Sequence, residues 1–337
     1  MTAMIDTRLV HNHVKGDARP MLARDADSIF WMGRYVERAE HVARLLRVHL
    51  MLLTDVGDLT PVLEHQMWLT ILSTMRLPGG EPEGEGPISG RIARYMTFDQ
   101  SNPSSIVSCI AKARENARAI RESITSEMWE CLNGIYWAVT SDEAQARFEE
   151  SPDEFFFQIM NGSMLFQGLT DATLAHDQRW HFTRIAKYLE RIDVTARVIE
   201  ARFDVLSQMG AQLDQPIRNI HLMGVLRSCC SLEAYRRQHM ADLDASRIAE
   251  FLILQSDFPR SIRFCVEQLH QAIAGVRISN GHHVPSQPER IIGRLGAQLE
   301  YASAEEILDE GLTSYLAKIE KITNEGSVAL QKAYFLY

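Results

Sequence analysis

The sequence predicts an all-α protein, a large helical bundle built from a tandem duplication whose two copies have a pseudo-twofold relation. Three observations lead to this fold class. Apolar residues recur every three or four positions over long segments, which is the spacing of a buried helix face. No alternation of apolar and polar residues typical of strands persists anywhere in the chain. An unusual phrase that contains a Glu-Arg pair occurs twice.

The repeated phrase is FWMGRYVERAEHVARLL at residues 30–46 and TRIAKYLERIDVTARVI at residues 183–199, an offset of 153 residues. A second match pairs NPSSIVSCI at residues 102–110 with FPRSIRFCV at residues 258–266, an offset of 156 residues. The order of the matches is kept and their spacing changes by only three residues. The sequence therefore predicts two copies, at about residues 22–150 and about 175–300.

The expected elements follow in chain order. Residues 1–20 have no periodicity and are expected to form a flexible N-terminal extension, whereas residues 21–337 are expected to form one domain of about a dozen helices. The first long helix of each copy carries a buried stripe of identical spacing, at Val36, Ala39, Ala43, Leu46, Leu50 and Leu53 and again at Leu189, Ile192, Ala196, Ile199, Phe203 and Leu206. Loops are predicted at residues 77–87 and 280–288, which are rich in Gly and Pro.

Three helix starts are predicted from capping residues. Asn102 precedes Pro103 and is expected to cap a helix whose first residue is that proline. The segments 151–154 and 303–306 both read Ser, two residues, Glu, which is the pattern of a capping box. The second of these is expected to open a C-terminal helix at about residues 303–336.

The Glu-Arg phrase supplies six candidate functional residues: Glu37, Arg38, Arg44, Glu190, Arg191 and Arg197. Three interpretations are open. The charges form solvated ion pairs, or half-buried bridges that lock the two copies together, or a ligand-binding or catalytic site. Because Arg38 and Arg191 border the apolar faces, each needs a carboxylate nearby. We therefore predict that Arg38 contacts Glu190 or Arg191 contacts Glu37, and that at least one such contact is largely buried.

No metal and no cofactor are predicted. A ferritin-like centre needs Glu-x-x-His, but Glu37 and His41 are four positions apart, and the second copy has Val194 at the position of His41. The motifs of serine hydrolases, P-loop proteins, dinucleotide-binding folds and zinc proteases are all missing from the sequence.

One basic feature is confined to the first copy. Arg114, Arg118 and Arg121 are spaced to share one helix face, whereas the second copy has His270, Ala274 and Arg277 there. Arginine binds carboxylate and phosphate through its planar fork, so these three residues are candidate anion-binding residues. The alternative is a solvated face that nearby glutamates balance.

Composition restricts the function classes. The formal net charge of −9 argues against nucleic acid as a partner, because a protein that coats nucleic acid needs a basic surface. No apolar segment is long enough to cross a membrane, and no secretory signal is visible. The five cysteines contain no CxxC pair and are interpreted as reduced thiols, which predicts a cytoplasmic protein.

Several ordered motifs together resemble a known family. The segments MLARDADSIFWMGRYVERAEHVARLL, NPSSIVSCIAKARENARAIRESITSEMWECLN, YLERIDVTAR and FPRSIRFCVEQL are similar to the bacterial alpha-E proteins, over about residues 21–330. The resemblance implies a partner, because such proteins commonly accompany circularly permuted ATP-grasp proteins. It implies no established catalytic residues.

The resemblance and the residues together predict a non-catalytic helical accessory protein. It would act with an ATP-grasp-type amide ligase in peptide synthesis or modification, and it could position a peptide or carboxylate substrate. One alternative is a peptide-modifying enzyme that uses the region of Glu37 and Glu190. Another is a purely structural scaffold. Exposure distinguishes these alternatives, since a catalytic carboxylate needs an open pocket.

Overall fold

The computed structural model describes all residues except 1–20, 57–60, 78–79, 210–213, 241 and 336–337. Within the described part of the chain, the secondary structure consists of fifteen α-helices and one short 3-10 turn, without strands. The predicted all-helical class is therefore confirmed. The predicted flexible extension at residues 1–20 lies outside the described residues. The described helices include none that is long and apolar enough to span a lipid bilayer.

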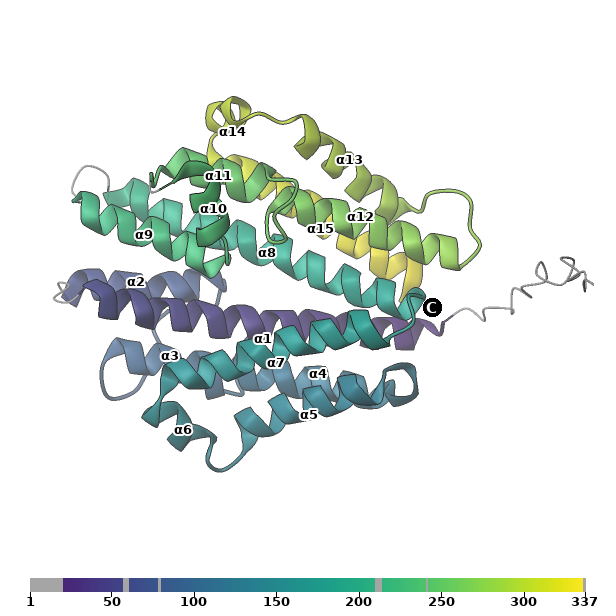
Figure 1. Cartoon of the computed structure of the whole chain (residues 1–337), viewed down its shortest axis with the longest axis horizontal. Coiled ribbons are helices and arrows are strands. Elements are labelled where there is room, and N and C mark those ends of the chain that lie inside the picture. The colour runs from purple at the N-terminus through teal and green to yellow at the C-terminus, as the bar shows by residue number, and fades with distance from the viewer. Residues whose placement is uncertain (1–20, 57–60, 78–79, 210–213, 241, 336–337) are drawn as a thin grey trace, which may run out of the picture.

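Two long helices form the centre of the bundle, α1 (Ala23–Val56) and α8 (Gln178–Met209). They lie side by side and run in the same direction (Figure 1). On one side of them lie α3 (Ile88–Phe98), α4 (Ile106–Ala119), α5 (Ser126–Thr140), α6 (Ala144–Glu150) and α7 (Pro152–Thr173). On the other side lie α10 (Leu232–His239), α11 (Ala245–Leu254), α12 (Ile262–Ser279), α13 (Gln287–Tyr301), α14 (Ala304–Glu310) and α15 (Leu312–Tyr334).

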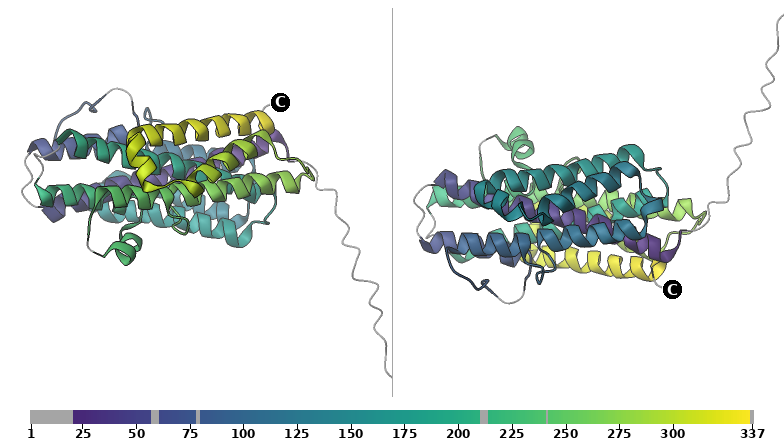
Figure 2. Two further views of the ribbon diagram at one scale, coloured as in Figure 1. Left: turned by 90° about the horizontal axis from the view of Figure 1, so that it is seen from above. Right: turned by 90° about the horizontal axis from the view of Figure 1, so that it is seen from below.

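The remaining helices, α2 (Pro61–Thr74) and α9 (Gln215–Ser228), pack at the end of the bundle where α1 and α8 finish. Views from above and below show most helices running along the long axis of the molecule (Figure 2). The core therefore follows the α1–α8 pair, and it includes the predicted stripe residues Val36, Ala39, Ala43 and Leu46.

Small side chains allow α1 and α8 to approach closely. Gly33 on α1 faces Ala186 on α8, and a Cβ atom added at Gly33 would lie only 2.8 Å from the Cβ atom of Ala186. Ala39, Ala43 and Ala196 are also fully buried. Because little side-chain volume separates the two backbones, the longer charged side chains of both phrases reach across the junction.

The helix starts differ in part from the predictions. Ser105, not Asn102, caps α4 and accepts a hydrogen bond from the Ser108 amide. Asn102 instead accepts from the Ser104 amide within the preceding turn, since the side chain of Asn also stabilises turns. The capping box at Ser303 is confirmed. The capping box expected at Ser151 is wrong, because the Ser151 side chain makes no capping hydrogen bond at the start of α7.

The predicted C-terminal helix at about 303–336 is two helices, α14 and α15. Gly311 separates them with φ of 86°, a left-handed conformation that favours glycine and interrupts a helix.

Candidate functional site

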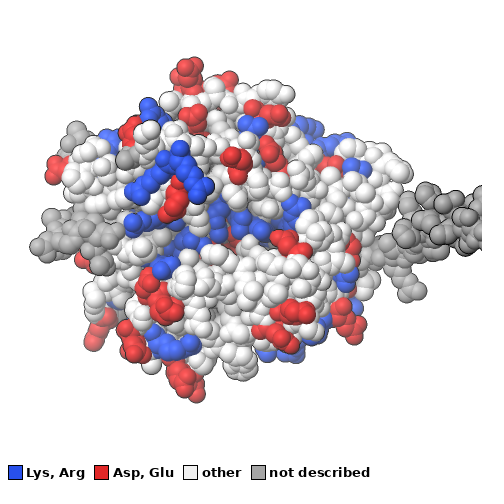
Figure 3. All heavy atoms as spheres, in the orientation of Figure 1, with Lys and Arg blue, Asp and Glu red and all other residues white. Residues whose placement is uncertain are grey.

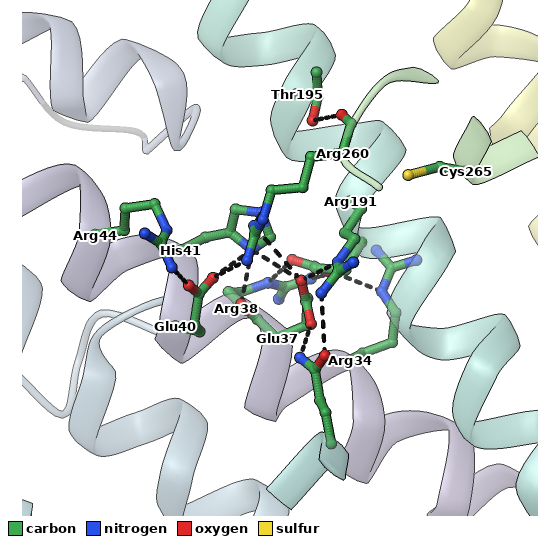
Figure 4. Close-up of polar contacts among 12 residues, drawn as sticks. Arg34, Glu37, Arg38, Glu40, His41, Arg44, Arg191, Thr195, Arg260 and Cys265 are labelled. Carbon is green, nitrogen blue, oxygen red and sulfur yellow. Dashed lines mark hydrogen bonds and ion pairs between the residues drawn. The ribbon is translucent and has the colours of Figure 1, made fainter. Parts of the chain in front are cut away.

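Charged side chains from the two Glu-Arg phrases meet in the interior between α1 and α8 (Figure 4). We call this set the Glu-Arg cluster, and it consists of Arg34, Glu37, Arg38, Glu40, His41, Arg44, Gln167, Glu190, Arg191 and Arg260. Two further elements complete the cluster that α1 and α8 begin, because Gln167 comes from α7 and Arg260 from the turn before α12.

Glu37 is 1% exposed, and other groups bind both of its carboxylate oxygens. The Arg191 Nε atom lies 2.5 Å from Oε1. The Gln167 amide donates to Oε2, while its own carbonyl oxygen accepts from Arg191 at 3.0 Å. The Arg260 guanidinium is 3.8 Å from Oε1. Glu37 is therefore enclosed by two arginines and one glutamine.

Glu190 is held in a similar way by arginines of α1. The Arg38 guanidinium forms a two-point contact, at 2.6 Å to Oε1 and 3.0 Å to Oε2. The Arg34 Nε atom lies 2.5 Å from Oε2. Both predicted contacts, Arg38 with Glu190 and Arg191 with Glu37, are thus present, and both glutamates are buried.

Glu40 and His41 form the third part of the cluster. Glu40 is fully buried and binds Arg44 one turn along α1, and its Oε2 atom lies 3.1 Å from Arg260. The His41 Nδ1 atom is 2.8 Å from the Glu37 carbonyl oxygen, and its Nε2 atom is 2.9 Å from an Arg260 nitrogen. Since arginine can only donate, these contacts assign the proton of a neutral imidazole to Nδ1.

Arg197 lies at the edge of the cluster. It pairs with Asp193 at 2.9 Å, four residues earlier on α8, and its side chain is 22% exposed. Pairing within one helix is thus found in both phrases, as Glu40 with Arg44 and Asp193 with Arg197.

The arginines keep the buried glutamates ionised. Burial alone would raise the pKa of Glu190, but the charges of Arg34 and Arg38 outweigh it and lower the pKa to about 2. Burial would likewise raise the pKa of Glu37, but the charges of Arg191 and Arg260 outweigh this effect. The pKa of Glu37 therefore lies below its ordinary value. Arg260 and Arg44 hold the pKa of Glu40 well below its ordinary value in the same way.

The pKa of His41 shifts in the direction that keeps its imidazole ring neutral. Burial is the largest cause and the neighbouring Arg260 charge is the next, and together they lower the pKa of His41. A neutral histidine and permanently ionised carboxylates are poor groups for proton transfer near neutral pH, because a general base works best when its pKa is near the working pH.

Glu37, Glu40 and His41 come close enough together to resemble a metal site, with ligand atoms within 4.8 Å of one another. Arginines already bind both carboxylates, however, and the two ring nitrogens of His41 contact a backbone carbonyl and Arg260. A divalent cation here would have to displace guanidinium groups and stand beside their charges. The donor set therefore fits arginine better than a metal ion.

The structure places the three candidate anion-binding arginines away from the cluster. The expectation that they share one helix is wrong, because α4 ends at Ala119 and Arg121 begins a 3-10 turn. Arg114 lies over the Tyr136 ring at 4.5 Å and donates to Asn133. The side chain of Arg118 is 70% exposed. Anion binding by these residues stays a prediction.

Sequence reasoning did not identify Gln167 and Arg260 as members of the cluster. The two sequence matches align Arg260 with Ser104 in the first copy, so comparing the copies gives no signal for it. Pro259, its neighbour, accepts a hydrogen bond from Arg191 at 3.3 Å. The match of residues 258–261 to the first copy depends on Pro259 and Ser261, and not on the arginine between them.

Comparison with known proteins places the chain in a family. Residues 21–335 match the Alpha-E family model, described as a predicted alpha-helical domain with a conserved ER motif. The chain is similar to Uncharacterized protein Mb2597 of Mycobacterium bovis and Uncharacterized protein Rv2567 of Mycobacterium tuberculosis, each 26% identical over 314 residues. The match covers 88% of this chain and 34% of each relative, so the chain spans about a third of their length. No solved structure matches it.

Proposed function

The chain belongs to the Alpha-E family, and from that premise we propose that it is a non-catalytic helical accessory protein of an ATP-grasp-type amide ligase. It would act with that ligase in peptide synthesis or modification. In this proposal the ligase activates a carboxylate with ATP, and the helical protein holds the peptide or carboxylate substrate.

The observation that carries the proposal is the closure of the Glu-Arg cluster. The Glu-Arg pairs point inward, and arginines together with Gln167 occupy the oxygens of Glu37 and Glu190. An enzyme that used these carboxylates as acid or base would need an open oxygen and a pKa nearer neutrality. The cluster therefore supports a role in holding α1 to α8, and it gives little support to the peptide-modifying enzyme.

The length of the relatives supports a function that needs a partner. In the mycobacterial proteins the region similar to this chain is about a third of one polypeptide. In those relatives the matched region is joined to further sequence in the same polypeptide. This is the arrangement expected of a domain that works next to another domain. We propose that the region described here has the same relation to an ATP-grasp-type ligase in the cytoplasm.

We also propose that the bundle arose by duplication. Matched residues make matched contacts: Ser105 and Ser261 both cap helices, and Cys109 and Cys265 donate to the carbonyl oxygens of Pro103 and Pro259. The Glu of each Glu-Arg pair, Glu37 or Glu190, is bound by the Arg of the other pair. This reciprocity is expected of a pseudo-twofold pair.

The test is reconstitution. The tagged protein is isolated from its own cell, and an ATP-grasp chain that accompanies it is identified by mass spectrometry and purified separately. We expect the helical protein alone to turn over no ATP, and the ligase to form amide at least about tenfold faster when it is added. ATP hydrolysis by the pure helical protein, or ligase turnover that is equal with and without it, would contradict the proposal.

A further inference from the structure

A pocket opens between α13, α14 and α15, away from the central α1–α8 pair (Figure 1). Its volume is about 630 Å³, within the range of about 300–1,000 Å³ that is usual for ligand pockets. Leu295 and Leu299 of α13 and Ile319 of α15 form an apolar floor, and all three are buried. Two tyrosines also line it, Tyr315 and Tyr301, and Tyr301 is 81% exposed.

The charges that line the pocket do not balance. They come from three glutamates and two lysines, which leaves one negative charge over, and these residues are Glu306, Glu310, Glu325, Lys318 and Lys321. Lys318 pairs with Glu310 at 2.7 Å, whereas no cation of the described residues lies within ion-pair distance of Glu306 or Glu325. Burial, followed by the charges of Glu306 and Glu310, raises the pKa of Tyr315, so the interior of the pocket is negative. One further cation would balance it.

The three helices around the pocket correspond to α5, α6 and α7 on the other side of the bundle. Those helices are 15, 7 and 22 residues long, and α13, α14 and α15 are 15, 7 and 23 residues long. Both sets have the same close contact. A Cβ atom added at Gly162 of α7 would lie 2.6 Å from the Ile135 Cγ1 atom of α5. One added at Gly326 of α15 would lie 2.6 Å from the Ile292 Cδ1 atom of α13.

A guanidinium group spans the space between α5, α6 and α7. Arg147 of α6 donates to the Ala138 carbonyl oxygen of α5 at 2.5 Å and to the Gln158 side chain of α7 at 3.3 Å. Helix α14 has no cation to place there, because its sequence is AEEILDE, whereas that of α6 is AQARFEE. Figure 3 shows Asp and Glu atoms at the upper edge of the molecule, where Figure 1 places α14, and Lys and Arg atoms across the middle.

We propose that this pocket binds an arginine side chain of a partner polypeptide. The arginine would supply the missing positive charge, as Arg147 supplies a guanidinium to the corresponding space. Carboxylate oxygens are available to it, since Glu325 has no ion-pair partner among the described residues and Glu306 uses Oε2 for the Ser303 amide at 3.1 Å. A charged guanidinium donor bound by carboxylates forms strong hydrogen bonds.

The shape and the walls of the pocket favour arginine over lysine. The guanidinium group is planar, stacks on tyrosine rings and donates several hydrogen bonds in a fixed fork, whereas an ammonium group is a compact, strongly hydrated charge. The volume also leaves room for the main chain beside the arginine. That the partner is the ATP-grasp-type ligase rests on the function proposed above, whereas the arginine site itself rests on the pocket.

Calorimetric titration of the full chain with three blocked tripeptides tests the site. The peptides are acetyl-Gly-X-Gly-amide, in which X is arginine, lysine or citrulline, and citrulline has nearly the shape of arginine without its charge. We expect the arginine peptide to bind at one site. The lysine peptide should bind at least about threefold more weakly, and the citrulline peptide at least about tenfold more weakly.

Glu325→Lys is expected to weaken binding of the arginine peptide by at least about tenfold, because it places a like charge in the pocket. Glu130→Lys is the matched control. Glu130 is an exposed glutamate of α5 outside the pocket lining, so its replacement changes the net charge equally and should leave binding unchanged. Both residues are exposed, and thermal unfolding checks that both variants fold.

Four results would each overturn the proposal. They are equal affinity for the arginine and citrulline peptides, tighter binding of the lysine peptide, no binding by the unaltered protein, and an equal loss of affinity in the two variants. Because no ligase is present in the titration, none of these results depends on the outcome of the reconstitution test.

Discussion

Replacing Glu37 with Gln is expected to lower the free energy of unfolding by about 3–5 kcal/mol, as for other buried charge pairs that lose one partner. The change removes a negative charge that is 1% exposed and leaves Arg191 and Arg260 buried beside a neutral amide. Gln also places a donor against guanidinium groups that only donate. Denaturant unfolding at neutral pH measures the difference.

Asp153→Asn is the control for this experiment. Asp153 contacts Arg47 at 2.7 Å, but its side chain is 54% exposed, so the loss should be only about 0–1 kcal/mol. A loss below about 1 kcal/mol for Glu37→Gln as well would mean that the buried pairs contribute no more than exposed ones, and the cluster would not hold α1 to α8.

Replacing Arg202 with Met is expected to have the opposite sign, raising the free energy of unfolding by about 1–4 kcal/mol. Arg202 is 2% exposed on α8, and its Nη1 atom has no hydrogen-bond partner. Its only polar contact within the described residues is with His49, at 2.6 Å from Nε2. Burial lowers the pKa of Arg202 to about 10, which reflects the cost of this charge.

Arg260→Met serves as the comparison, since it removes another buried arginine, one that does contact carboxylates. That variant should be destabilised, because Glu40 loses a partner. Chemical unfolding of both variants separates the two cases. If Arg202→Met instead loses more than about 1 kcal/mol, then Arg202 is neutralised in solution by an anion.

The sequence predicted much of this architecture because periodicity and repetition both report on burial. The stripe containing Val36 and Ala43 identified the helix that forms the centre of the bundle. The border position of Arg38 and Arg191 predicted their partners, since a charge beside an apolar face needs a counter-charge.

The sequence did not reveal the residues of the Glu-Arg cluster that have no counterpart in the other copy. Gln167 lies between the two predicted copies and Arg260 is aligned with Ser104, so neither periodicity nor repetition singles them out. His41 was set aside as a metal ligand by its spacing, and its actual partner, Arg260, is 219 residues away. Contacts of such separation depend on how helices pack, which local patterns do not encode.

Glu37 and Glu190 are, in this view, structural groups that stay ionised near neutral pH. Their folded pKa values lie below the ordinary value of 4.5, so the stability they contribute is complete above pH of about 4.5 and is lost as pH falls through the folded values. The direct measurement is an NMR titration of carbon-13-labelled Glu side chains, assigned with Glu37→Gln and Glu190→Gln. The account predicts that neither signal moves between pH 7 and about pH 4, and that Glu190 titrates near 2 or only as the fold is lost in acid. A midpoint above pH of about 5 for either carboxyl would contradict it and would favour an acid–base role.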